Sequence, residues 1–498
     1  MNIKEKIEQA LKEKMKPEAY QALLAKINSC SESQQTALWQ SLYFLEETPH
    51  HICLQGAAGS GKSYLAGVLK DILVVLFPQS VVACASTHQA KRVLSKSLGG
   101  FACSTLHRIL ELMPDEQEDK LVFTPKSKSL ALFELGQNIK AGQDMDMPIP
   151  EVSPLENCKF LIVDEVSMVD SQVFTYLKDV LPSSTKVIGI GDPYQLPPVY
   201  QEDHKVTEKS RFFTDESFRQ IYLEGIMRQS ANSPIIKQSE EVRLMQRDTL
   251  TPEVTDAGVG IIQYQSVKAF ADAYLEKVHS AKEALNCRIL AFTNNKVNEI
   301  NRYIRQCIYQ TTEPLVVGEY IMLQEPVRDA DNPRNIIINN GEILEVVTIK
   351  EMTKTFFFAF SKQSITIPYL EIEVRILFDD EQNDKLVTLN MISDEKTYEE
   401  FKKALSYEAL QLKMAKRQGL LKGKEAKMMW DYWWKDRAFF IISKPIFAST
   451  VHKAQGTTLE SVFVYTTDFQ PAKNFDFELY YQLLYVAITR AKNQVHFV

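Results

Sequence analysis

The sequence predicts an α/β protein in which two blocks of parallel sheet are separated by a β-rich insertion. Between about residues 50 and 200, short apolar runs alternate with stretches of helical periodicity, and apolar runs of the same kind return near 288, 461 and 494. Strands that alternate with helices are typical of parallel sheets, whose strands read as continuous apolar runs. Residues 315–440 break this rhythm, so we expect them to form a separate unit.

The predicted elements follow in chain order. Residues 1–27 form two short amphipathic helices that are separated at Pro17. The first sheet takes its strands from 51–55, 81–86, 159–163 and 186–190, and the second from 288–292, 461–465 and 494–498. Runs at 320–323, 343–348, 356–360, 370–378 and 386–389, broken by turns such as Asn340-Gly341, predict a small β-barrel. Residues 395–437 then turn helical and basic.

Composition places the chain among globular proteins and excludes several classes. Of its 498 residues 45% are hydrophobic and 24% are charged, with 57 Lys and Arg against 64 Asp and Glu. The net charge of −7 excludes a polybasic chain that holds nucleic acid by bulk charge, although a local basic groove stays open. Seven cysteines without a CxxC pair or zinc spacing indicate free thiols. With no apolar run of about 20 residues and no signal peptide, we expect a cytoplasmic location.

A glycine-rich segment, GAAGSGKS from residue 56, follows the first predicted strand and opens a helix with an apolar inner face. Glycines allow backbone N–H groups to wrap around phosphates at a helix N-terminus, where the dipole favours anions. Lys62 would reach the β- and γ-phosphates, and the Ser63 hydroxyl would bind Mg²⁺. A chance glycine-rich turn is the alternative, which the flanking strand and helix disfavour. The nucleotide-binding residues predicted here are Gly56, Gly59, Ser60, Gly61, Lys62 and Ser63.

The apolar strand 159–163 ends in two carboxylates, Asp164 and Glu165. At the carboxyl end of a parallel strand, Asp164 can hold Mg²⁺ directly or through water. Glu165 can orient or deprotonate the attacking water. Many strands end in a solvated acidic turn, so the pair alone says little. Behind a P-loop it predicts nucleotide hydrolysis.

The segment GDPYQLPPV from residue 191 follows the next apolar strand. A proline-rich turn would explain its prolines but not a glutamine beyond a strand end beside Asp164. Gln195 is therefore expected to sense the γ-phosphate. With the Asp-Glu pair before it, the segment resembles motif III of superfamily 1 helicases.

Other segments follow the order of that superfamily's nucleotide motifs. Residues 31–37 resemble the Q motif, whose glutamine, here Gln34, reads adenine. Residues 226–229 resemble motif IV and residues 484–492 motif VI, which implies that Arg228 and Arg490 reach the γ-phosphate, Arg490 as the arginine finger. Residues 449–457 resemble motif V, with Gly456 expected at the nucleotide. Two arginines from outside the P-loop block can stabilise the transferring phosphoryl group when the domains close on it.

The resemblance also implies a DNA-binding set. Residues 86–90, 105–107, 291–295 and 449–457 resemble motifs Ia, Ib, IVa and V. For each threonine taken singly, a helix N-cap or strand-end hydroxyl is the alternative. The residues implied in DNA contact are Thr87, His88, Thr105, His107, Thr293, Asn294, Asn295, Thr450, His452 and Lys453.

Within superfamily 1 the chain most resembles the RecD-like branch, superfamily 1B, and especially the bacteriophage Dda helicases. Asn339-Asn340-Gly341 opening a β-rich insert, HKAQG from residue 452 and QLLYVAITRAK from residue 482 carry this resemblance. It implies two RecA-like domains, a pin domain and an SH3-type β-barrel with a helical extension. The domains expected are 1A at 31–107 and 155–232, 1B at 108–154, 2A at 233–314 and 440–498, and 2B at 315–439. Residues 1–30 would be a helical extension.

The resemblance further implies an ATP-dependent DNA helicase that uses ATP and Mg²⁺ and moves 5′→3′ on single-stranded DNA. Its expected partner is a single-strand/duplex DNA junction, with replication or single-strand-binding proteins as candidates and a monomer as the functional unit. An RNA-directed motor of the same superfamily and a nucleotide-gated switch without motor activity are the alternatives.

Three features carry two interpretations each. Phe123 matches the aromatic tip of the pin domain, where it would stack on a freed base, but a Phe buried in a small hairpin core is the alternative. The stretch 402–427, with eight Lys or Arg against two Glu, is interpreted as a solvated helix face or strut, with DNA or a partner as the alternative. Trp430, Trp433 and Trp434 are expected to be core anchors, not stacking platforms.

Overall fold

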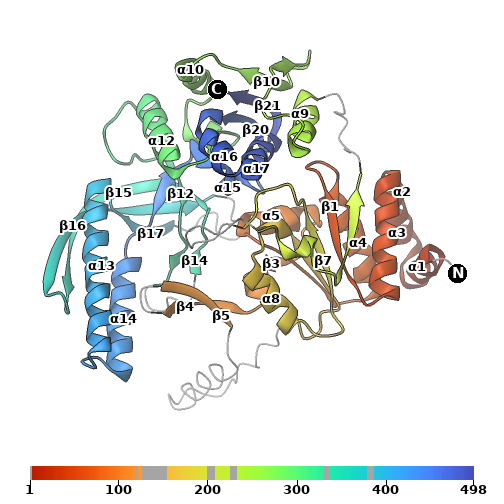
Figure 1. Cartoon of the computed structure of the whole chain (residues 1–498), viewed down its shortest axis with the longest axis horizontal. Helices are drawn as coiled ribbons and strands as arrows, with labels where there is room; N and C mark the ends of the chain where they lie inside the picture. The colour runs from red at the N-terminus through yellow and green to blue at the C-terminus, as the bar shows by residue number, and fades with distance from the viewer. Residues whose placement is uncertain are drawn as a thin grey trace. The chain divides into compact units, whose positions relative to one another are not determined.

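The computed structural model describes residues 3–117, 120–125, 154–198, 208–224, 233–329, 336–377 and 386–498, with side chains at all of these except 113–117 and 120–125. The chain divides into two compact units (Figure 1). The first comprises Met1–Leu112, Pro125–Gln263 and Ala454–Val498, and the second Met113–Thr124 and Tyr264–Lys453. The finer division into domains 1A, 1B, 2A and 2B remains a prediction.

A six-stranded sheet forms the first α/β block, and every pair of neighbouring strands is parallel. The order is β3-β2-β6-β7-β1-β8. All four strands predicted for this block are present. The strands are β1 (His51–Gly56), β2 (Val81–Ala85), β3 (Cys103–Thr105), β6 (Phe160–Asp164), β7 (Lys186–Gly191) and β8 (Phe218–Leu223).

Helices of the first unit cover this sheet. Ile7 and Leu11 of the first helix belong to the same buried cluster as Leu65 and Leu69 behind the P-loop. The N-terminal residues therefore pack into the core of the first block. The break at Pro17 is confirmed, since Pro17 starts a helix at a position that needs no N–H donor. The helices are α1 (Ile3–Lys14), α2 (Pro17–Asn28), α3 (Glu32–Glu47), α4 (Lys62–Leu76), α5 (His88–Ser97), α6 (Leu106–Ile109) and α8 (Ser171–Val180), with short 3₁₀ turns Val166–Met168 and Arg211–Phe213.

The first unit also contains four strands in the order β9-β10-β21-β20, with β21 parallel to both β10 and β20 and β9 antiparallel to β10. Helix α17 (Phe477–Thr489) is apolar on all sides, and every residue from Leu479 to Ile488 is buried. The other elements are α9 (Pro234–Arg243), β9 (Glu253–Val254), β10 (Gly260–Gln263), β20 (Leu459–Val464), the 3₁₀ turn Thr466–Phe469, α16 (Gln470–Phe475) and β21 (Ala491–Phe497).

In the second unit, β11 (Cys287–Ala291) runs parallel to β19 (Ala448–Thr450). The Asn301 amide ties these strands to a helix, because it donates to Ala448 O at 3.0 Å and accepts from Ala448 N at 2.8 Å. The helices here are α10 (Val267–Lys277), α11 (Ala281–Ala284), α12 (Asn294–Tyr309) and α15 (Val451–Ala454).

The β-rich insertion is an antiparallel five-stranded sheet in the order β17-β16-β15-β12-β18. The prediction of separate strands at 343–348 and 356–360 is wrong, because β15 is one strand of 16 residues. Its middle residues are mostly polar and exposed, so they carry no apolar signal although they pair fully with β16. The strands are β12 (Tyr320–Leu323), β15 (Ile343–Phe358), β16 (Gln363–Ile376), β17 (Leu386–Met391) and β18 (Ser443–Pro445); β13 (Val327–Arg328) and β14 (Ile336–Ile338) form a separate pair.

Helices α13 (Glu395–Arg417) and α14 (Gly423–Ala438) pack against the half of the β15–β16 ribbon that lies next to its turn. The three tryptophans of α14 are confirmed as core anchors, since they are 8%, 6% and 3% exposed. The lysines and arginines of 402–427 are exposed, apart from the half-buried Lys413, as a solvated face requires. Among the described residues, no helix is both long and apolar enough to cross a membrane.

Strands β4 (Leu112–Gln117) and β5 (Lys120–Pro125) pair with each other. Phe123 lies in β5, but its side chain is outside the described part of the structure, as are residues 126–153 of the predicted pin domain. The two interpretations of Phe123 therefore both stand.

Candidate nucleotide site and nucleic-acid surface

The glycine-rich segment forms a loop between β1 and α4. Gly59 and Gly61 have φ of 83° and 84°, a left-handed conformation that residues with a Cβ rarely adopt. At Gly56 a Cβ would come within 2.6 Å of Ser60 Oγ and 3.1 Å of Leu223 Cβ, so a larger residue would displace these neighbours. The loop then opens α4 at Lys62, with its first N–H groups directed at the loop.

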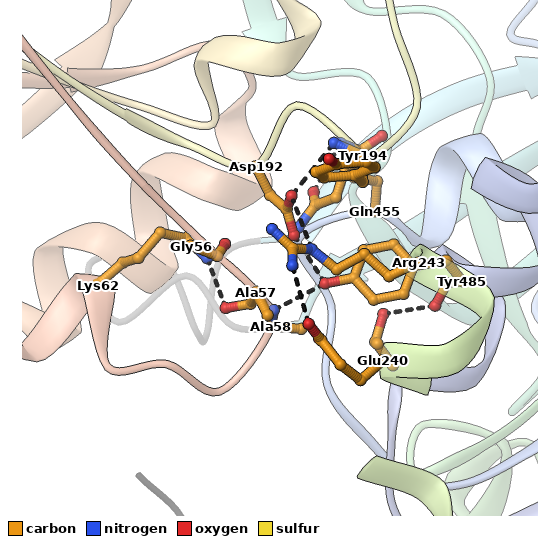
Figure 2. Close-up of polar contacts among 12 residues, drawn as sticks. Gly56, Ala57, Ala58, Lys62, Asp192, Tyr194, Glu240, Arg243, Gln455 and Tyr485 are labelled. Carbon is orange, nitrogen blue, oxygen red and sulfur yellow. Dashed lines mark hydrogen bonds and ion pairs between the residues drawn. The ribbon is translucent and has the colours of Figure 1, made fainter. Parts of the chain in front are cut away.

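Lys62 turns its ammonium group into this loop (Figure 2). The Nζ atom donates to Gly56 O at 2.6 Å and to Ala57 O at 2.9 Å. Burial lowers the pKa of Lys62, while the negative charges of Asp192, Glu165 and Asp164 act in the opposite direction. A phosphate at the loop would therefore offer this cation a stronger partner than two carbonyl groups.

Both the oxygen and the nitrogen of the Gln34 side-chain amide make hydrogen bonds. Its Oε1 accepts from Ser31 N at 3.1 Å in a capping box, and its Nε2 donates to Ser60 O at 3.4 Å and Gly61 O at 3.5 Å. The side chain is 1% exposed. Gln34 thus fixes the start of α3 against the P-loop, and its predicted contact with adenine stays a prediction.

Asp164 and Glu165 lie at the carboxyl end of β6, on the same edge of the sheet as the P-loop after β1. Asp164 Oδ1 accepts from Glu165 N at 2.9 Å. Burial and then the charge of Glu165 raise the pKa of Asp164 to about 7. Glu165 has φ of 52°, which is uncommon for a residue with a side chain and typical of functional sites.

Gln195 contacts a residue that the sequence interpretation did not single out. Its Oε1 accepts from Gln455 Nε2 at 3.1 Å, and the same Nε2 lies 3.3 Å from Ser167 Oγ. Both glutamines are 5% exposed. The segment that resembles motif V is thereby bonded to the segments that follow β6 and β7. In the sequence, Gln455 was marked only as part of the HKAQG match to motif V.

Arg243, at the end of α9, is a second residue that the sequence did not reveal. Its Nε lies 3.4 Å from Asp192 Oδ1, its Nη1 donates to Glu240 Oε1 at 3.0 Å, and its guanidinium carbon is 4.5 Å from the centre of the Tyr194 ring (Figure 2). Its charge is one of those that lower the pKa of Lys62. Arg228, which the sequence predicted for the γ-phosphate, lies outside the described residues.

Arg490 is 6% exposed and is held at the end of α17. Its guanidinium donates to Val486 O at 3.1 Å, Thr457 O at 3.2 Å and Thr489 Oγ1 at 3.1 Å. On the same helix, the Tyr485 hydroxyl contacts both Asp192 and the P-loop residue Ala58 (Figure 2). The motif VI helix therefore reaches the nucleotide loop through Tyr485, while a contact of Arg490 with the γ-phosphate remains a prediction.

The threonines predicted to contact DNA are helix N-caps, as the alternative interpretation had it. Thr87 and Thr105 accept from Ala90 N at 3.1 Å and Arg108 N at 3.4 Å. Thr293 and Thr450 accept from Lys296 N at 3.2 Å and Lys453 N at 3.3 Å. Capping does not exclude a DNA contact, which stays a prediction.

Gly456 has φ of 78° and faces Ala90. A Cβ built on Gly456 would lie 3.9 Å from the Cα of Ala90.

Positive charge gathers near His88 in the first unit. Burial, and after it the charges of Lys91, Arg92, His107 and Arg108, together lower the pKa of His88 to about 4. Burial also lowers the pKa of His107. The His88 ring is therefore neutral at pH 7 and lies beside cations that suit a phosphate backbone.

Within the second unit, motifs IVa and V meet at one small hollow, which Asn294, Thr450 and Lys453 help to line. Lys444 also lines it and donates to Asn294 Oδ1 at 3.0 Å, and Lys453 donates to Gln324 Oε1. Burial and the charge of Lys444 lower the pKa of Lys453 to about 8. Burial lowers the pKa of His452 to about 4, and Asn295 is exposed.

These features define the class of the chain. A P-loop on a parallel sheet, an Asp-Glu pair on the same edge and a glutamine that bonds to motif V together describe a superfamily 1 helicase motor. Residues 30–257 match an AAA domain, residues 312–445 the Dda helicase SH3 domain and residues 445–498 a UvrD-like helicase C-terminal domain.

The family follows from sequence identity. The chain is 31% identical over 477 residues to the ATP-dependent DNA helicase dda of Enterobacteria phage T4, covering 94% of this chain and 99% of that protein. It therefore belongs to the Dda helicases of superfamily 1B. It is also 24% identical over 319 residues to the ATP-dependent DNA helicase Pif1 of Campylobacter jejuni, covering 62% of each. A solved structure of two coordinating Pif1 helicases at forked dsDNA aligns over 94% of this chain and 92% of that one, at 16% identity and a TM-score of 0.48.

Proposed function

We propose that the chain hydrolyses ATP at the P-loop edge of its first sheet, moves 5′→3′ along single-stranded DNA and separates duplex DNA at a junction. Membership of the Dda family makes it an ATP-dependent DNA helicase; its polarity and the roles of its residues are proposals. The observation that supports these roles is a chain of hydrogen bonds that links motif I to motif VI, motif VI to motif III and motif III to motif V through Asp192 and Gln195.

In this proposal the P-loop binds the phosphates. Lys62 leaves the carbonyl groups of Gly56 and Ala57 for the β- and γ-phosphates, and the loop N–H groups donate to phosphate oxygens. Ser63 and Asp164 fit a Mg²⁺ ion, since both offer oxygen ligands and a cation would offset the unfavourable pairing of Asp164 with Glu165. When bound, that ion neutralises charge on the β- and γ-phosphates.

Glu165 then orients the attacking water and accepts its proton, and Gln195 binds the γ-phosphate. Because Gln195 bonds to Gln455, a change at the γ-phosphate reaches the segment that carries Thr450 and Lys453. Arg490 and Arg228 are proposed to stabilise the charge that develops on the transferring group. The short path from Gln195 to motif V is what would convert hydrolysis into movement on DNA.

The residues proposed to contact DNA form one set in each unit. In the first unit it is Thr87, His88, Thr105 and His107, and in the second Thr293, Asn294, Asn295, Thr450, His452 and Lys453. Lys444 joins the second set, because it lies beside Asn294 and adds a cation to the same hollow. Cations and neutral polar groups of this kind bind phosphates without reading sequence. Phe123 is proposed to stack on the base freed at the junction.

Strand displacement tests the proposal. Duplexes with either a 5′ or a 3′ single-stranded tail are incubated with the chain, ATP and Mg²⁺. We expect strand release from the duplex with the 5′ tail and not from the duplex with the 3′ tail. Release from the 3′-tailed duplex alone would contradict the proposed polarity. A DNA and an RNA strand of one sequence, compared for stimulation of ATP hydrolysis, identify an RNA motor if RNA is the better activator. Hydrolysis that ignores both strands would indicate a switch.

A further inference from the structure

The hydroxyl of Tyr485 joins the P-loop to the carboxylate of Asp192 (Figure 2). It accepts a hydrogen bond from Ala58 N at 2.8 Å and donates one to Asp192 Oδ2 at 2.7 Å. Tyr485 is 1% exposed and Asp192 is fully buried. The bond between Tyr485 and Asp192 is therefore shielded from water and the bond from Ala58 N is partly shielded, which makes each of them costly to leave unreplaced.

Asp192 holds the hydroxyl in this position. Its other oxygen, Oδ1, accepts from Tyr194 N at 3.1 Å and pairs with Arg243 Nε at 3.4 Å. A buried carboxylate needs donors on both oxygens, and Tyr485 supplies the one on Oδ2. The hydroxyl proton is thus committed to Asp192, and the hydroxyl lone pairs face the loop.

Ala58 is the third residue of the glycine-rich segment, whose N–H groups are its means of binding phosphate. A single N–H makes one good hydrogen bond at a time. A phosphate oxygen that binds the Ala58 N–H must therefore take the place of the Tyr485 hydroxyl.

We propose that Tyr485 is a positioning residue that senses phosphate in the P-loop. The Ala58 N–H donates either to the Tyr485 hydroxyl or to the nucleotide, and this exchange frees α17 from the loop when nucleotide binds. Arg490 follows directly after α17, so the exchange links phosphate binding to the position of the predicted arginine finger. The inference rests on the proposed nucleotide site and adds to it the residue that reports its occupancy.

The test is the affinity of the full chain for a fluorescent N-methylanthraniloyl derivative of ADP. Tyr485→Phe removes the competing hydroxyl and keeps the ring, so the dissociation constant is expected to fall about three- to tenfold. Tyr480→Phe is the matched control, since its hydroxyl, on the same helix, donates to Asp248 O at 2.7 Å. Its affinity should equal that of the wild type.

If Tyr485 serves only in packing, its replacement should not tighten the binding of the probe. If Tyr485→Phe binds the probe no more tightly than the wild type, the inference is overturned. Lys62→Ala serves as a separate check on the site itself. Binding by Lys62→Ala at wild-type affinity would show that the nucleotide does not occupy this loop and would remove the basis of both proposals, whereas failure of Tyr485→Phe alone leaves the nucleotide site intact.

A second measurement covers the case in which Tyr485→Phe unfolds. The full chain with 3-fluorotyrosine incorporated only at position 485 is titrated with ADP and followed by fluorine NMR. Exchange of the Ala58 bond changes the surroundings of the ring, so a shifted resonance at saturation is expected. An unshifted resonance at saturating ADP would overturn the inference.

Discussion

At the scale of single residues, Asp192 explains why distant segments of the first unit converge. Its buried carboxylate accepts from Tyr194 N on its own turn, from Tyr485 on α17 and from Arg243 on α9. Buried carboxylates are stable only when donors surround them, and these three donors satisfy both oxygens. The nucleotide loop is bonded to this cluster through Ala58, so the cluster and the loop form one polar network.

The first prediction at this scale concerns Lys62. Lys62→Ala should reduce ATP hydrolysis by about 100-fold or more and abolish unwinding, because the loop loses the ammonium group proposed to bind the β- and γ-phosphates. The fold should persist, since the side chain bonds only to two loop carbonyls. Lys14→Ala is the control, because Lys14 also donates to a carbonyl, Leu76 O at 2.9 Å, but does so on the surface. Full DNA-stimulated turnover in Lys62→Ala would refute the site.

The second prediction concerns the bond between Gln455 and Gln195. Gln455→Ala leaves the Gln195 amide oxygen buried without this donor, at a cost of about 1–3 kcal/mol. We expect the stimulation of ATP hydrolysis by single-stranded DNA to fall by roughly tenfold, with a smaller loss of DNA-free hydrolysis. Steady-state rates with and without DNA measure this. A double-mutant cycle with Gln195→Ala checks the pairing, and fully additive effects would show that the two residues act separately.

At the scale of elements, the arm formed by α13, α14 and the β15–β16 ribbon depends on a buried glutamate. Glu408 of α13 is 5% exposed, and its carboxylate accepts from Phe360 N at 2.9 Å and Ser361 N at 2.7 Å in the turn between β15 and β16. Trp433 Nε1 donates to Leu405 O at 2.9 Å and binds α14 to α13. The long ribbon and the two helices are therefore held by a few buried polar bonds within an apolar core.

Glu408→Ala should lower the stability of this arm by about 1–3 kcal/mol, because two turn N–H groups lose their acceptor. Hydrogen exchange of the β15–β16 turn measures the loss locally, and ATP hydrolysis should not change. Glu399→Ala on the same helix is the control, since its contact with Lys402 at 3.1 Å is exposed and contributes little. Equal protection of the turn in both variants would contradict the role of Glu408.

Elements with a strong apolar signal were predictable from the sequence, and contacts between distant segments were not. The strands that follow continuous apolar runs, such as β6 and β7, lie where the pattern placed them. The middle of β15 was not predicted because most of its residues are polar and exposed, so they form no apolar run. The contacts of Arg243 and Tyr485 were not predicted for another reason. Their partner Asp192 is 51 and 293 residues away, and no local pattern shows which segments folding brings together.

At the scale of the whole molecule, a net charge of −7 coexists with local clusters of cations. Lys91 and Arg92 lie near His88 in the first unit, and Lys444 lies near Lys453 in the second. Both clusters are at predicted DNA contacts, so the overall charge and the local field have opposite signs. For this reason the composition excluded only the binding of nucleic acid by overall charge, and the residues expected to contact DNA had to be found from motifs.

Half-buried histidines in both units give the molecule a common response to acid. Burial lowers the pKa of His51, His88 and His452 to about 4, against about 6.5 for an exposed ring. His51 Nδ1 also accepts from Val187 N at 3.2 Å, which requires the neutral ring. Because the unfolded chain binds these protons more readily, the stability from the neutral rings is complete above about pH 6.5 and is lost as the pH falls towards 4.

The free energy of unfolding should therefore decrease between pH 6.5 and 4, by about 1–3 kcal/mol for each of these histidines. His51→Gln removes one of the titrating groups and should flatten the decrease over this range, although it also loses the bond from Val187. The groups that act on His51 are Lys186, Lys178, Asp215 and His50, and none is altered in this variant. His279→Gln, at an exposed position, is the control and should keep the wild-type slope. Chemical denaturation at a series of pH values measures the slope, and identical slopes in His51→Gln and the wild type would show that His51 is protonated in the folded chain at these pH values.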